Sequence, residues 1–443
     1  MASAAEQLAS NLNWGAFAKA SELHKRLLFT LGALIVYRLG TYVPIPGIDV
    51  GVYAQAFQNL SGGLLGVANM FSGGAVERLA IFALNVMPYI SASIIMQLLS
   101  ATVPSLERLK KEGEVGRKQI NQYTRYLTVV LATFQAYGIA VGLQSSPGLG
   151  VNPGGFFIAT TVITLVGGTI FLMWLGEQIT ARGVGNGISL IIFSGIVAEL
   201  PRAIFQTLNL GRVGELQLFE VLAIIGLAAG VIVFIVFMER SQRRLLVQYP
   251  KRQQGSRMVG GESSFLPLKV NTAGVIPPIF ASSLLLLPAT AAGFTQQSGS
   301  GILQTVVAAL AHGQPLFMAL YAGLIIFFCF FYTSIVINPE ETADNLRNYG
   351  GFLPGMRPGK RTAEYIDYVL TRLTVVGSLY IAFVCLLPEV LIAYYNIPFY
   401  LGGTSLLIVV TVTMDTVSQI QSHLLAHQYE GLIKKTKLRG RKR

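Results

Sequence analysis

Few side chains in this sequence could carry catalysis or hold a metal. The histidines and cysteines are limited to His24, His312, His423, His427, Cys329 and Cys385. His423 and His427 share a helical face, but no third ligand is near them in the sequence, and no HExxH motif occurs. Each cysteine lies inside an apolar run, which is typical of a small buried hydrophobe. We therefore expect no metal, no cofactor and no enzymatic activity.

Two glycine-rich stretches superficially resemble phosphate-binding loops. GMRPGKRT at 355–362 has one residue too few between its glycines, and GVGNGIS at 183–189 follows no predicted strand. A nucleotide site is therefore not expected, and any use of ATP would belong to a partner.

The composition predicts a polytopic membrane protein. Of 443 residues, 52% are apolar and only 12% are charged, whereas a soluble domain carries about 25% charged residues. A membrane-crossing helix needs about 20 mostly apolar residues. Because lipid satisfies no backbone polar group, we expect an all-α bundle of ten transmembrane helices. The ten stretches are 27–45, 79–103, 126–143, 155–175, 187–207, 217–238, 270–292, 315–337, 373–395 and 402–422.

Basic residues predict the orientation of these spans. Of the 33 Lys and Arg residues, 29 fall in segments on one side, and only Arg78, Arg202 and Arg212 fall on the other. Arg38 lies inside the first span, where its side chain can extend toward the interface. The positive-inside rule then places both termini and the basic loops in the cytoplasm. The formal charge of +12 also suits anionic lipids or an acidic or RNA-containing partner.

Ten spans divide into two halves of five, which must insert with opposite topology. That is the geometry of an inverted repeat around a central pathway. The expected parts are an N-terminal arm (1–26), an N-terminal half (27–207), an outer hinge loop (208–216), a C-terminal half (217–422) with long loops at 239–269 and 338–372, and a basic tail (423–443).

Prolines interrupt the second span of each half, through Pro88 in one and Pro277 and Pro278 in the other. Proline removes a helix donor, and interrupted spans at matching positions indicate a transport pathway. Simple helix kinks are the alternative. One further apolar segment, 63–76, is too short to span, since a dozen helical residues reach at most about 18 Å. It either lies in the membrane interface or folds back into the protein as a plug.

Six motifs resemble the bacterial SecY family, whose members form the centre of a protein-conducting channel. They are MFSGGAVERLAIFALNVMPYISASIIMQLL, LGEQITARGVGNGIS, LPLKVNTAGVIPPIFASS, INPEETADNL, FLPGMRPGKRT and GGTSLLIVV, and they occur in order along nearly the whole chain. The poorest matches are 1–22, 208–217 and 293–313. The resemblance implies a waist of aliphatic side chains, a plug and a lateral gate.

The waist would be a pore ring formed by Val86, Ile90, Ile188, Ile192, Ile279 and Ile408. The first four residues form two i,i+4 pairs, so each pair points one way from its helix. Stiff, uncharged, β-branched side chains can form a dry collar that blocks ions by dewetting. Val86 stands where the family leads us to expect isoleucine. Read singly, any of these residues could be an ordinary core or lipid-facing aliphatic.

The resemblance also implies which residues form the plug and the gate. Plug residues within 63–76 would be Leu64, Leu65, Asn69, Met70, Phe71, Ser72 and Gly73. The lateral gate, where signal sequences meet lipid, would lie between the second and seventh spans. Its polar lining would include Ser91, Gln97, Asn271 and Ser282.

The two long loops resemble those that SecY offers to the ribosome and to the SecA motor. Arg357 falls on the family's central arginine, and Tyr429 lies in the tail motif HQYEG. Capping a turn or binding lipid phosphate is the alternative role for Arg357. Glu340 stands where the family often has a basic residue. The expected docking residues are Lys251, Arg252, Arg257, Arg357, Lys360, Arg361 and Tyr429.

The expected function is a passive channel for unfolded, signal-bearing polypeptides in the bacterial inner membrane, open across the membrane or sideways into it. The resemblance implies as partners SecE, SecG, SecA, the ribosome, signal peptides and nascent chains, a membrane insertase and anionic lipids. A ten-span transporter of a small solute is the rival, but it needs polar ligands at the midplane, and the sequence supplies few. A lipid-modifying enzyme would need a catalytic cluster, and none is apparent.

Overall fold

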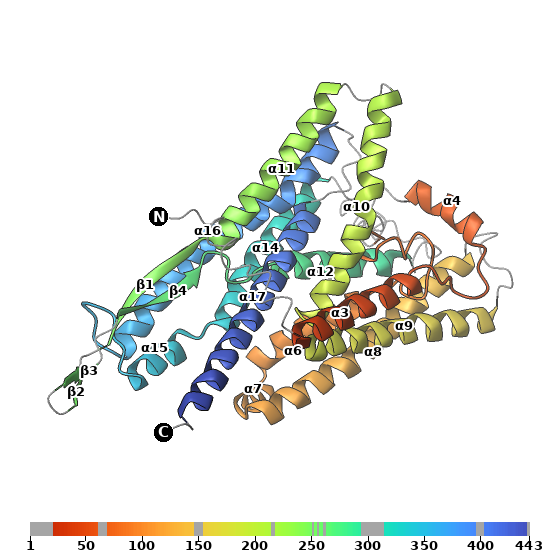
Figure 1. Cartoon of the computed structure of the whole chain (residues 1–443). Coiled ribbons are helices and arrows are strands. Elements are labelled where there is room, and N and C mark those ends of the chain that lie inside the picture. The colour runs from red at the N-terminus through yellow and green to blue at the C-terminus, as the bar shows by residue number, and fades with distance from the viewer. Residues whose placement is uncertain are drawn as a thin grey trace. The chain divides into compact units, whose positions relative to one another are not determined.

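The computed structural model describes residues 21–60, 69–145, 154–213, 218–249, 252–254, 257–259, 263–293, 314–395 and 403–440 (Figure 1). The chain divides into two compact units. The first unit comprises Met1–Ser93, Asn121–Arg202 and Ile408–Arg443, and the second comprises Ile94–Ile120 and Ala203–Leu407. The predicted all-α membrane class is confirmed, because long apolar helices dominate both units.

Every predicted apolar stretch contains part of a helix. In chain order the helices are α3 (Ser21–Gly40), α4 (Val50–Leu60), α6 (Met87–Thr102), α7 (Pro104–Lys111), α8 (Glu114–Ser145), α9 (Gly155–Arg182), α10 (Gly187–Val213), α11 (Leu218–Arg240), α12 (Ile276–Gly293), α14 (Pro315–Val336), α15 (Pro339–Asn348), α16 (Lys360–Tyr395) and α17 (Gly403–Gly440). Among the described residues, seven helices are long and apolar enough to cross a bilayer, and α6 with α7, bent by 97°, would make an eighth. The count of ten spans stays a prediction.

The prolines in the two interrupted spans begin helices instead of kinking them. Pro88 lies in the first turn of α6, and Pro277 and Pro278 lie in the first turn of α12. Proline suits the start of a helix because its missing N–H would be unpaired there and its φ is already helical. Both helices therefore begin later than predicted, at 87 instead of 79 and at 276 instead of 270. The chain just before each helix, at 72–86 and 270–275, runs through turns and bends instead of a helix.

Loop 239–269 contains β-structure that the sequence analysis did not predict. Strand β1 (Gln242–Gln248) pairs antiparallel with β4 (Ser263–Lys269), and β2 (Arg252–Gln254) pairs with β3 (Arg257–Val259). On one face of the longer ribbon, Leu245, Val247 and Leu268 are buried in a small core with Ile366 and Leu370 of α16. This core fixes the base of the ribbon.

Loop 338–372 contains the short helix α15. The side chain of Asn338 accepts a hydrogen bond from the backbone N–H of Glu340 at 3.1 Å, and Pro339 occupies the first helical position. Both features are favourable at a helix start. Glu340 lies in the first turn, where the helix dipole favours a negative charge. The acid that departs from the family pattern therefore stabilises the helix that carries it.

Candidate functional site

The segment between α4 and α6 carries most of the expected plug residues. Leu64 and Leu65 lie outside the described residues, whereas Asn69, Met70, Phe71, Ser72 and Gly73 lie within them. Phe71 and Ser72 are buried, and the chain then runs through successive turns as far as residue 86. Asn85, next to α6, has φ +50°, a left-handed conformation that few residues other than glycine adopt.

Three consecutive carbonyls of this segment each accept a hydrogen bond from a side chain outside the plug residues. Asn85 Nδ2 donates to the carbonyl of Phe71 at 2.7 Å. From α3, the Tyr37 hydroxyl donates to Ser72 O at 3.1 Å and Arg38 Nη1 donates to Gly73 O at 2.6 Å. A buried carbonyl is costly to leave unpaired. Residues 71–73 are therefore seated at one defined position within the first unit.

Gly195 on α10 lets this segment approach closely. A Cβ at Gly195 would lie 2.6 Å from Phe71 O, 3.1 Å from the Tyr37 hydroxyl and 3.2 Å from Gly73 N. The first distance is shorter than van der Waals contact allows. The packing of the segment on α10 thus requires glycine at this position.

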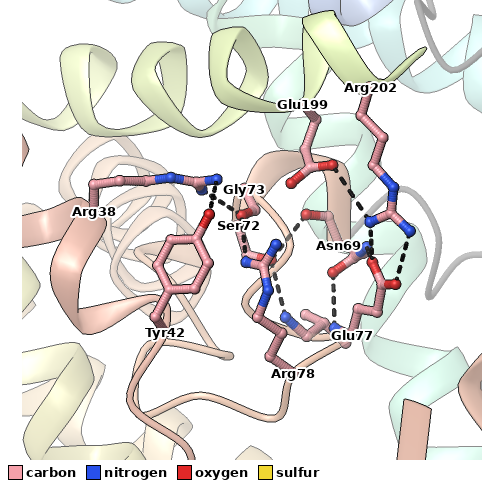
Figure 2. A network of polar contacts seen from close by, with 10 residues as sticks. Arg38, Tyr42, Asn69, Ser72, Gly73, Glu77, Arg78, Glu199 and Arg202 are labelled. Atoms are coloured by element: carbon pink, nitrogen blue, oxygen red, sulfur yellow. Dashed lines mark hydrogen bonds and ion pairs between the residues drawn. The ribbon is translucent and has the colours of Figure 1, made fainter. Parts of the chain in front are cut away.

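An ion-pair network continues the contact with α10 (Figure 2). Arg202 donates to both carboxylate oxygens of Glu77, from Nη1 to Oε2 at 2.8 Å and from Nη2 to Oε1 at 3.0 Å. Glu199, one turn before Arg202, lies 3.9 Å from the same guanidinium. Asn69 Oδ1 accepts from the backbone N–H of Glu77 at 2.8 Å. Arg202 therefore contacts two carboxylates, and Glu77 is the nearer partner.

Two more arginines crowd the same segment. Arg38 and Arg78 both lie over the ring of Tyr42, with their Cζ atoms 5.0 and 4.3 Å from the ring centroid. Arg78 also donates to Gly73 O, from Nη1 at 3.4 Å. Hydrogen bonding to Arg202 holds the pKa of Glu77 below its usual value. The Arg38 side chain does reach a polar group, but that group is the carbonyl of Gly73.

The six expected pore-ring residues are divided between the units. Ile279 belongs to the second unit and the other five belong to the first. Ile188 is half-buried, and the rest are buried, with Val86, Ile90, Ile192, Ile279 and Ile408 exposing 8% or less. Val86 and Ile90 lie one helical turn apart at the start of α6, because Ile90 N donates to Val86 O at 3.0 Å. That the six surround one axis stays a prediction.

The expected gate residues differ in their surroundings. Ser91 and Asn271 are buried, and Gln97 and Ser282 are half-buried. Asn271 lies just before α12, donates to Glu239 on α11 and to Gly274 O at 3.2 Å, and accepts from Gly274 N at 3.0 Å. Its amide therefore holds the turn that begins α12, within the second unit. The Ser282 hydroxyl donates back to Ile279 O at 2.9 Å.

The expected docking residues are described only in part. Lys251 lies outside the described residues, as do the side chains of Arg252, Arg257 and Tyr429. Arg357, Lys360 and Arg361 are exposed at the start of α16. Thr362 Oγ1 donates to Arg357 O at 3.0 Å, and Gly355 and Gly359 adopt φ +80° and +105°. A tight turn thus presents three cations to solvent.

Sequence reasoning missed Tyr37, Glu77, Asn85 and Gly195, whose contacts are described above. Glu77 lies within the quoted motif MFSGGAVERL, beside Arg78, and that adjacent pair was the available signal. Cys329 and Cys385 are both buried, as predicted. Within the described ranges, no group of three His, Cys, Asp or Glu residues could hold a metal.

The chain is similar to curated bacterial proteins along nearly its whole length. It is 57% identical over 425 residues to "Protein translocase subunit SecY" of Vibrio cholerae, covering 95% of this chain and 96% of the relative. The Escherichia coli K12 protein of the same name is 56% identical over 423 residues, with the same coverage. The Rickettsia bellii protein of that name is 54% identical over 428 residues, covering 95% and 98%.

Solved structures share the fold at low sequence identity. One, described as "The structure of a protein conducting channel", has a TM-score of 0.64 at 17% identity and covers 91% of this chain and 93% of its own. Another, "Sec61 in the Canine ribosome-channel complex from the endoplasmic reticulum", has a TM-score of 0.61 at 17% identity with the same coverage. The SecY family model matches residues 80–417. The chain therefore belongs to the SecY family and is a multi-pass protein of a bacterial membrane.

Proposed function

We propose that this chain forms the channel through which unfolded, signal-bearing polypeptides cross the cytoplasmic membrane or leave it sideways as membrane spans. Membership of the SecY family supports this class of function, because the curated relatives are named as subunits of protein translocase. No observation favours the rival solute transporter.

The structural observation that supports the proposal is the set of side-chain hydrogen bonds that hold residues 71–73, the proposed plug. Phe71 ends a short helical turn and residues 72 and 73 lie in turns, and side chains from α3 and from Asn85 hold the carbonyls of all three residues. A segment held by a few specific contacts, and not by a continuous hydrogen-bond ladder, can leave its seat without unfolding a helix. That combination suits a closure that must open.

The pore ring in this proposal consists of Val86, Ile90, Ile188, Ile192, Ile279 and Ile408. A ring without charge offers a passing chain neither ion pairs nor hydrogen bonds, so no particular sequence is retained. Signal sequences would leave between α6 and α12, past Ser91, Gln97 and Ser282. Asn271 would act there by holding the start of α12, since its amide is already bonded within the second unit.

The basic cytoplasmic surface would dock the partners that supply the driving force. Arg357 is exposed on the turn before α16, and Lys360 and Arg361 are exposed in the first turn of that helix. The β1–β4 ribbon packs on the same helix. We propose that this surface engages SecA or the ribosome, that Lys251, Arg252, Arg257 and Tyr429 contribute to it, and that SecE and SecG complete the complex. Both termini would be cytoplasmic.

Export by reconstituted vesicles tests the proposal. The chain would be assembled with SecE and SecG in vesicles that contain anionic lipid, and a signal-bearing precursor would be added with SecA and ATP. We expect the precursor to become protected from protease, and a precursor lacking its signal to remain accessible. Uptake of neither precursor by vesicles that contain the assembled complex would contradict the proposed function.

A further inference from the structure

One acidic side chain links the plug segment to α10. Glu77 lies 125 residues from Arg202 in the chain, yet both of its carboxylate oxygens bond to that guanidinium. The Glu77 side chain is 17% exposed and Arg202 is 48% exposed. A paired, bidentate arginine–carboxylate contact with one sheltered partner is the strong kind of charged hydrogen bond.

The same carboxylate also organises its own segment. Asn69 Oδ1 accepts from the backbone N–H of Glu77, and Asn69 Nδ2 lies 3.5 Å from Glu77 Oε2. Asn69 is thereby held at one end of the plug residues, eight positions before Glu77. The Glu77–Arg202 pair thus joins α10 to the segment 69–77, which also packs against Gly195 (Figure 2).

We propose that Glu77 and Arg202 form an ionic latch that holds the plug segment against α10, and that neutralising Glu77 releases this segment. The proposal rests on the proposed function, because release matters only where the segment closes a channel. Glu77 and Arg202 are positioning residues, since they act through residues 69–73.

The charges around Glu77 explain why neutralising this acid would weaken the contact between the segment and α10. Arg202 and Glu199 face it from α10, and Arg78 approaches it from its own segment. A third arginine, Arg38 of α3, shares the ring of Tyr42 with Arg78. Without the Glu77 charge, the segment would keep Arg78 beside the remaining cations and lose its main anion. Neutralisation thus removes an attraction and leaves like charges close together.

The latch has a defined pH dependence. Hydrogen bonding to Arg202 is the largest cause that lowers the pKa of Glu77 from its usual 4.5. Because the seated state lowers this pKa, the latch is fully present at neutral pH and is lost as the pH falls through the lowered value. Release of the segment returns Glu77 toward its usual pKa. A neutral glutamine at this position would abolish the dependence.

A second ion pair in the same unit provides a matched control. Arg125 donates to both oxygens of Glu177, at 2.9 and 2.7 Å, and so links α8 to α9. Arg125 is as exposed as Arg202, at 48%, whereas Glu177, at 32%, is more exposed than Glu77. This pair joins two regular helices. In the described part of the chain, it makes no hydrogen bond to residues 69–86. Its removal should leave the plug seated.

The test uses a cysteine reporter on the plug. Ser72 is fully buried, so Ser72→Cys reports unseating through its reaction with a membrane-impermeant maleimide added to the outer face of vesicles carrying the complete complex. The native cysteines would be replaced by serine. We expect Glu77→Gln to raise the labelling rate at least about tenfold at neutral pH, and Glu177→Gln to change it less than about twofold.

Two further measurements decide the interpretation. Arg202→Gln should raise labelling as Glu77→Gln does. Acidifying the outer face stepwise below pH 4.5, the usual pKa of a glutamate, should raise ion conductance in the parent protein but not in Glu77→Gln. Equal labelling of Glu77→Gln and the parent, in vesicles that still export precursor, would overturn the latch and leave the proposed function standing. Equal increases from Glu77→Gln and Glu177→Gln would also overturn it. Failure of the parent to export would instead count against the proposed function.

Discussion

Gly195→Ala tests whether the plug segment is seated on α10 as described. The added methyl carbon would lie 2.6 Å from Phe71 O, and that oxygen is already held by Asn85 at 2.7 Å. The close neighbours at Phe71 O and Gly73 N are backbone atoms, so no side-chain rotation can relieve the contact. The segment must move away from α10, and the Asn85 bond must lengthen or break.

The size of the effect follows from three contributions. Overpacking in a well-packed site costs about 2 kcal/mol, and loss of one hydrogen bond costs about 1 kcal/mol. Alanine in place of glycine within a helix returns about 1 kcal/mol. The net destabilisation of the seated state is about 2 kcal/mol, which corresponds to a roughly thirtyfold increase in the ratio of unseated to seated segment.

The assay is the frequency of channel opening in planar bilayers that contain the complex but no precursor. Gly167→Ala on α9 is the matched control, because a Cβ there meets nothing within 4 Å. We expect Gly195→Ala to open roughly thirtyfold more often than the parent and Gly167→Ala to behave as the parent does. If both variants open equally often, the close approach of α10 and the plug segment is wrong.

Two further predictions concern the long loops that follow α11 and α14. Arg357→Glu should abolish SecA-dependent export while the subunit still inserts into the membrane, and Arg347→Glu, another exposed arginine of the same loop, should export normally; undiminished export by Arg357→Glu would refute its docking role. Ile366→Ala removes a fully buried side chain from the core beneath the β1–β4 ribbon. This change should destabilise the packing of the ribbon on α16 by about 2–5 kcal/mol. Trypsin should then cleave the ribbon faster than in Val375→Ala, which alters an exposed position, and equal cleavage rates would contradict the packing.

Hydropathy located the helices because a bilayer imposes a long apolar run on every span. It placed the starts of α6 and α12 too early, since an apolar run does not distinguish a helix from the buried turns before Met87 and Ile276. The β1 strand left a weak signal in the alternation of QRRLLVQ, where Leu245 and Val247 are buried. That signal was too short to stand out inside a basic loop.

The seat of the plug could not be read from the sequence. Its contacts join Tyr37 to Ser72 and Glu77 to Arg202, positions that are 35 and 125 residues apart. Periodicity reports only which face of one element is apolar, and it carries no information about such distant pairs. The length of the apolar segment 63–76 predicted an interfacial segment or a plug, but it could not indicate that Gly195 on another helix makes room for residues 71–73.

The central claim is that an uncharged aliphatic ring lines the path of the translocating chain. A photoreactive amino acid at Ile90 or Ile192, both buried, should crosslink to a precursor stalled during translocation. The same probe at Ile163, 72% exposed on α9, should crosslink to lipid and not to the precursor. Crosslinks to the stalled precursor from Ile163 but from neither Ile90 nor Ile192 would contradict the account.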